Sequence, residues 1–160
     1  MELLKSLPIR PVAMACGQTV VVAMILALLQ WLVFVATAVF VPAAAVELLV
    51  AGLFALPFNW ILVGTENFLF LLYPAPPVAT GSEGFLMMGR VVLFMLVKVL
   101  VLGVGSAVAA IPATVVYLVT GSVPAVCLVA WLALLFPALG VLLLVAWAFR
   151  RYDVSAGATG

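Results

Sequence analysis

The sequence predicts an all-α membrane protein, a bundle of four transmembrane helices with a short N-terminal interfacial helix and a cytoplasmic interfacial segment. Hydrophobic residues make up 69% of its 160 residues and charged residues only 7%, against roughly half and a quarter in ordinary globular domains. No charged residue stands between Arg10 and Glu47 or within residues 99–149, and about 20 apolar residues suffice to cross a bilayer. We therefore expect a single transmembrane domain over residues 1–160.

The spanning segments are expected to be helices rather than strands. Lipid offers the backbone no hydrogen-bond partners, which leaves helices or closed barrels. Barrel strands alternate polar and apolar residues, whereas residues 20–26 are apolar at every position. The predicted spans cover about residues 17–41, 43–64, 86–109 and 123–149.

The first eleven residues are predicted to form the interfacial helix. Leu3, Leu4 and Leu7 lie at helical spacing, and prolines end the segment. A signal peptide is the competing interpretation, but the apolar stretch at residues 17–41 exceeds the usual h-region of about 7–15 residues.

The first two spans are expected to form a tight hairpin, because the second begins directly after Pro42. Within the second, Pro57 and Asn59 are predicted to bend the helix and to add a polar contact. Residues 65–89 form the main polar interval. Residues 68–73 inside it are too few to cross, so they are expected to lie along the cytoplasmic surface.

The uncharged run of residues 99–149 is too long for one crossing and must turn near Gly121. Residues 111–120 fit a re-entrant turn, a helix extension or a fifth span. Four spans place every basic loop residue on one side, which is the positive-inside pattern, whereas five would put the C-terminal arginine pair outside. Four spans and two cytoplasmic termini are therefore favoured, on the positions of Lys5, Arg10, Arg90, Arg150 and Arg151.

Recognised catalytic patterns are missing from the sequence. It has no histidine, no GxSxG, no phosphate-binding GxxxxGK[ST] loop and no CxxC pair. Cys16 and Cys127 are its two cysteines, and its net charge is +1. We therefore expect no enzyme active site, no cofactor, no metal site and no nucleic-acid partner.

Four charged residues are candidates for a functional role. Lys98 lies about two turns deeper than Arg90 in an apolar span, where an unpaired charge costs about 3 kcal/mol. Glu47 is its one candidate partner inside the membrane, but Glu47 fits a solvated residue near the outer end of the second span equally well. Snorkelling to the surface is the alternative for the lysine. Glu66 and Arg90 are both expected on the cytoplasmic side and are candidates for a polar pair. Chance proximity is the favoured alternative, because exposed pairs usually contribute less than about 1 kcal/mol.

Small residues recur in the third span at Gly103 and Ala107, a spacing that lets a second helix approach closely. This face is predicted to pack against another helix of the bundle.

Several stretches resemble the membrane subunits of bacterial ABC exporters. The start of the chain is similar to the cytoplasmic coupling segment of these permeases, the middle to their later half and the end to their closing motif. The similar stretches are LKSLPIRP at residues 4–11, ACGQ at 15–18, ENFLFLLYP at 66–74, GF at 84–85, GR at 89–90 and AFRRYDVS at 148–155.

The resemblance implies a permease subunit, corresponding to the C-terminal half of family members, in the bacterial inner membrane. A separate ATP-binding subunit would supply the energy and would dock on Leu3, Leu4 and Leu7. Family permeases have about two further spans, so a complete protein, a fragment and half of a split permease remain open. A second permease chain or the missing N-terminal half would then be a further partner. The alternative class is a small non-transporting scaffold or assembly subunit that acts through helix association. The sequence identifies no substrate.

Overall fold

The computed structural model describes residues 11–73 and 83–151. These residues form four long helices and one short 3-10 turn: α2 (Pro11–Phe40), η1 (Pro42–Ala44), α3 (Ala45–Leu72), α4 (Glu83–Thr120) and α5 (Val123–Arg151). Each long helix contains a stretch that is long and apolar enough to cross a membrane. The prediction of an all-α, four-span, multi-pass membrane protein is therefore confirmed.

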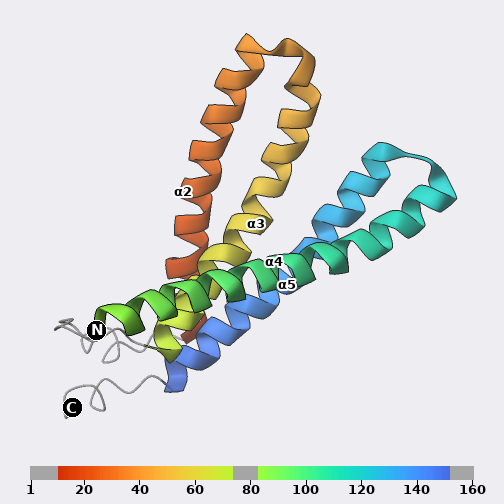
Figure 1. Ribbon diagram of the computed structural model, residues 1–160. Coiled ribbons are helices and arrows are strands. Elements are labelled where there is room, and N and C mark those ends of the chain that lie inside the picture. Colours follow the sequence, from red (N-terminus) through yellow and green to blue (C-terminus); the bar gives the residue numbers. More distant parts are fainter. Residues whose placement is uncertain (1–10, 74–82, 152–160) are drawn as a thin grey trace.

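The helices are arranged as two hairpins, α2 with α3 and α4 with α5 (Figure 1). Pro42 opens the turn of the first hairpin. Gly121 ends α4 with a φ of +61°, a left-handed conformation that glycine adopts without strain, and its N–H bonds to the Tyr117 carbonyl. The tips of the two hairpins diverge, while their other ends gather (Figure 1). The start of α2 and the end of α5 therefore lie on the same side of the bundle.

The core lies between α3 and α5. About a third of the apolar window of α5 is buried (33%), against 6% in α4, so α4 is the most peripheral helix. At the gathered end, Val145 and Phe149 of α5 lie in one buried cluster with Leu71 of α3, and Cys16 of α2 packs against it. The remaining apolar faces are exposed, as expected of helices whose solvent is hydrocarbon.

The two hairpins cross where small residues allow close approach. A Cβ added at Gly105 of α4 would lie 3.6 Å from both Ile61 of α3 and Pro137 of α5, and Ile61 is fully buried. One turn further toward the gathered end, Gly64 of α3 faces Val141 of α5 so closely that a Cβ would come within 2.5 Å of its Cγ1. These glycines set the distance between the hairpins.

Two helices, α3 and α4, continue by two turns or more past the ends that the sequence suggested. Residues 111–120, for which three arrangements were open, continue α4 as helix through Pro112. Residues 65–72 continue α3, so the prediction that residues 68–73 form a separate surface segment was wrong. Gly64 does not end α3 because it is packed against α5, and no proline follows until Pro74. The predicted N-terminal interfacial helix lies outside the described residues.

Candidate functional site

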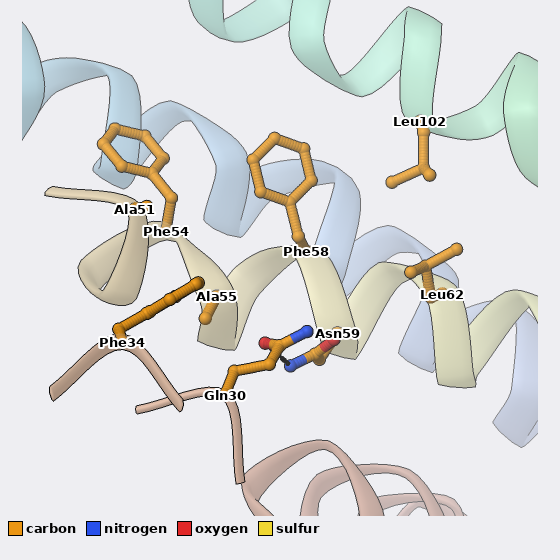
Figure 2. A pocket seen from close by; sticks show the side chains of 9 residues that line it. All are labelled: Gln30, Phe34, Ala51, Phe54, Ala55, Phe58, Asn59, Leu62 and Leu102. Atoms are coloured by element: carbon orange, nitrogen blue, oxygen red, sulfur yellow. Dashed lines mark hydrogen bonds between the residues drawn. The ribbon is translucent and has the colours of Figure 1, made fainter. Parts of the chain in front are cut away.

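A groove of about 390 Å³ opens on the side of α3, between α2 and α4. Its walls are mostly apolar, with three phenylalanines and two leucines, and its polar lining residues are two carboxamides, Gln30 and Asn59 (Figure 2). Phe54 and Phe58 project from α3 in the same direction, with ring centroids 6.5 Å apart. Leu102 of α4 closes the groove opposite Leu62, so both hairpins contribute to it.

The two carboxamides point toward each other across the α2–α3 interface (Figure 2). Asn59 Nδ2 donates a hydrogen bond to Gln30 Oε1 at 2.7 Å, and Asn59 is only 4% exposed. Gln30 lies about 15 Å along α2 from Phe40 and about 21 Å from Cys16. The pair therefore sits near the middle of its candidate spans, where polar side chains are costly and most often functional.

Lys98 forms an ion pair with Glu66 rather than with Glu47. Its Nζ lies 3.0 Å from Glu66 Oε2, and the pair joins α4 to α3. Glu47 is exposed in the first turn of α3, about 28 Å along that helix from Glu66. The candidate Lys98–Glu47 pair is therefore not formed, because the two residues lie at different depths, and Glu47 fits the alternative of an exposed residue near the helix end.

The candidate pair of Glu66 with Arg90 is not formed either. The Arg90 guanidinium lies over the Phe94 ring, 5.0 Å from its centroid, one turn further along α4. Glu66 pairs with Lys98 instead, and Lys98 lies two turns deeper than Arg90 on α4. The Lys98 side chain is 20% exposed and that of Glu66 63%, so Glu66 extends toward the outside of the bundle.

The small residues of α4 that pack inside the chain are not those predicted. Gly103 and Ala107 are exposed, and a Cβ added at Gly103 would meet nothing within 4 Å. Gly105, Ala109 and Ala113, spaced four apart, are buried instead. The Gly103/Ala107 face therefore points away from the described helices.

A tryptophan satisfies the backbone group that Pro57 leaves unpaired. Pro57 has no N–H to donate to the carbonyl of Leu53, four residues earlier in α3. Trp131 of α5 donates its indole Nε1–H to that carbonyl at 2.8 Å. The bond ties the two hairpins together toward their diverging ends.

We expect Trp131→Phe to lower the free energy of unfolding by about 1 kcal/mol, the usual size of a hydrogen bond between membrane helices. The loss should nearly vanish in a Pro57→Ala background, because the new backbone N–H at position 57 can then pair with Leu53. A double-mutant cycle, measured by unfolding in mixed detergent micelles, checks this. Equal losses in both backgrounds would show that the indole bond does not compensate for the proline.

The described residues contain no group of three histidine, cysteine or acidic side chains that could hold a metal ion. Cys16 and Cys127 are free thiols. Leu3, Leu4 and Leu7, the predicted coupling residues, lie outside the described residues. Gln30 was missed by the sequence analysis, although a lone carboxamide in the apolar stretch of residues 20–36 was a usable signal.

No protein-family model, curated protein or solved structure matches this chain.

Proposed function

We propose that this chain is the membrane-spanning permease subunit of an ABC-type exporter, in a bacterial inner membrane with both termini cytoplasmic. A separate ATP-binding subunit hydrolyses ATP, and this chain has no catalytic role. The observation that carries the proposal is the groove with its Gln30–Asn59 pair, at mid-depth and at the junction of two hairpins. Transporters commonly bind their substrates near the bilayer midplane, between helical units that move against each other.

The core holds α3 to α5, so the loosest interface available for such a motion is that between α3 and α4. Among the described elements, no Cα atom of α2 lies within 8 Å of one of α4, and α3 lies along α4 over a shorter stretch than along α2 or α5. Leu102 and the Lys98–Glu66 pair both bridge α3 and α4 on the gathered-end side of the Gly105 crossing. Tilting α4 at that crossing would open or close the groove at Leu102 and strain the ion pair.

A second candidate is a non-transporting scaffold subunit that acts through helix association. The observation in its favour is the outward-facing Gly103/Ala107 face of α4, since small residues let another transmembrane helix approach closely. This face is compatible with both functions, because a permease subunit also pairs with a second membrane chain.

The transport proposal predicts that Leu4→Asp and Leu7→Asp abolish association with the ATP-binding subunit while the four spans still insert. A two-turn apolar stripe can fill a shallow groove on a partner, and truncating one central leucine there costs about 1–2 kcal/mol, or about tenfold in affinity. A buried aspartate costs more. The measurement is a detergent-solubilised pull-down with the tagged chain, with the associated ATPase subunit identified by mass spectrometry.

Ser6→Asp is the matched control, because it adds the same charge to the same segment away from the leucine stripe and should keep association. Recovery of an ATPase subunit with wild type and Ser6→Asp alone supports the permease. Full association and substrate-stimulated ATP hydrolysis in both leucine variants would remove this segment as the coupling element. Recovery of a membrane enzyme, or of no ATPase, with the wild-type chain would favour the scaffold.

A further inference from the structure

We propose that the groove between α2, α3 and α4 binds a neutral amphiphile from the bilayer, a molecule with a hydrocarbon chain and an uncharged ester, amide or hydroxyl group. That this amphiphile is the exported substrate rests on the proposed transport function. That the groove binds it does not.

The walls of the groove select for hydrocarbon. Phe34, Phe54, Phe58, Leu62 and Leu102 present aromatic and aliphatic surface, and no lining residue carries a charge. A charged group brought to this depth would meet no opposite charge, and an unpaired charge there is costly. The lining thus favours an apolar chain and disfavours an ionic head group.

The groove also opens toward the hydrocarbon of the bilayer. Gln30 and Ala51 on its rim are exposed on the lateral surface of helices that cross the membrane. Hydrocarbon covers that surface at mid-depth, so a ligand arrives by sideways diffusion within the bilayer. The volume of the groove, about 390 Å³, falls in the range of about 300–1,000 Å³ that is usual for small-molecule sites.

The carboxamide pair supplies the polar selectivity. The Gln30–Asn59 bond uses one proton of Asn59 Nδ2 and one lone pair of Gln30 Oε1. Each carboxamide has two donor protons and an acceptor oxygen, so the Gln30 NH₂ group and Asn59 Oδ1 keep capacity for a ligand. Within the described part of the chain these two groups make no other hydrogen bond. In hydrocarbon they have no water to bind, which makes a ligand carbonyl or hydroxyl a favourable partner.

The test is equilibrium binding to the purified full chain, without any ATPase, followed by native mass spectrometry from a non-ionic detergent. Three probes differ at the head: 1-monooleoylglycerol is neutral and polar, oleate is anionic and 1-octadecene has no polar group. We expect monooleoylglycerol to bind at least about tenfold more tightly than either of the others, since one or two hydrogen bonds distinguish it.

Gln30→Leu should remove this preference, lowering monooleoylglycerol affinity about tenfold to the level of octadecene. Gln18→Leu is the matched control: it makes the same substitution on α2 outside the groove lining and should bind as wild type. Ala51→Trp places a bulky side chain at the rim of the groove, about 12 Å along α3 from Asn59, and should abolish binding of all three probes. It tests the site even if Gln30→Leu does not fold.

Three results would overturn the inference: no monooleoylglycerol binding, tighter binding of oleate, or unchanged binding in Ala51→Trp. Octadecene binding as tightly as monooleoylglycerol, or an unchanged preference for monooleoylglycerol in a folded Gln30→Leu chain, would show that the carboxamides do not recognise the ligand. Either result would also overturn the inference. The proposed permease function is tested by a separate result, the recovery of an ATPase subunit. Binding without an associated ATPase leaves the amphiphile site standing, and an associated ATPase without binding leaves the permease standing.

Discussion

Gly64→Leu is expected to prevent α3 and α5 from packing, with a loss of about 3 kcal/mol or more, and Gly64→Ala to cost about 2 kcal/mol. A Cβ at position 64 would come within 2.5 Å of Val141 Cγ1 and 3.4 Å of Thr19 Cγ2. Valine in a helix is held in one χ1 rotamer, so Val141 cannot turn away. Overpacking of this kind typically costs about 1–3 kcal/mol and exceeds the gain of up to about 1 kcal/mol from replacing a helical glycine by alanine.

Gly103 is the matched control, because a Cβ there would meet nothing within 4 Å. Gly103→Ala should be neutral or slightly stabilising, and Gly103→Leu should leave the bundle intact. Val141→Ala removes the clashing methyl group and should recover most of the stability of Gly64→Ala. Unfolding of the purified chain in detergent, followed by circular dichroism, measures each change. Equal losses at positions 64 and 103 would mean that α3 and α5 do not meet at Gly64.

Glu66→Gln is expected to lower the free energy of unfolding by about 2 kcal/mol, because it leaves the Lys98 charge without its partner 3.0 Å away. An unpaired lysine in the membrane costs about 3 kcal/mol on insertion scales, and snorkelling recovers part of this. If water surrounded the pair, the loss would stay below about 1 kcal/mol. The size of the loss therefore reports which medium the pair occupies.

Removing the lysine should have the opposite effect on stability. Lys98→Leu is expected to leave insertion unchanged or improved, and Glu66→Gln with Lys98→Leu should be as stable as Lys98→Leu alone. Transport should fall in Lys98→Leu and in the double variant, since the Lys98–Glu66 pair joins the two hairpins. Glu47→Gln, which changes an exposed carboxylate at the other end of α3, is the control and should change neither property. Undiminished transport by a well-folded Lys98→Leu chain would show that the Lys98–Glu66 pair has no part in transport.

The sequence was sufficient for the four helices, because in lipid a long apolar run has no alternative to a helix. It was insufficient for their ends, and one such error had a second consequence. Ending the second span at Gly64 placed Glu66 outside the membrane, which left Glu47 as the one candidate partner of Lys98 inside it. Gly64 continues α3 because Val141 packs against it, a contact that sequence position does not reveal.

The packing face of α4 was unpredictable for a different reason. Small residues occupy two of its faces, one with Gly103 and Ala107 and one with Gly105 and Ala109. Both spacings allow close approach, and only the position of α3 and α5 decides between them. The groove could not be predicted either. Gln30 and Asn59 are 29 residues apart, and their pairing depends on the register of the α2–α3 hairpin.

We expect four helices to cross the membrane with the gathered ends of both hairpins on the cytoplasmic side. Single cysteines at Ser6, Ser155, Ala43 and Ser122, in a chain with Cys16 and Cys127 replaced by alanine, test it with a membrane-impermeant maleimide applied to intact cells and to inverted vesicles. We expect Ala43 and Ser122, at the hairpin tips, to be labelled only in intact cells, and Ser6 and Ser155 only in inverted vesicles. Labelling of Ser6 and Ser155 from opposite sides, or of either tip from the same side as the termini, would contradict the four-span arrangement.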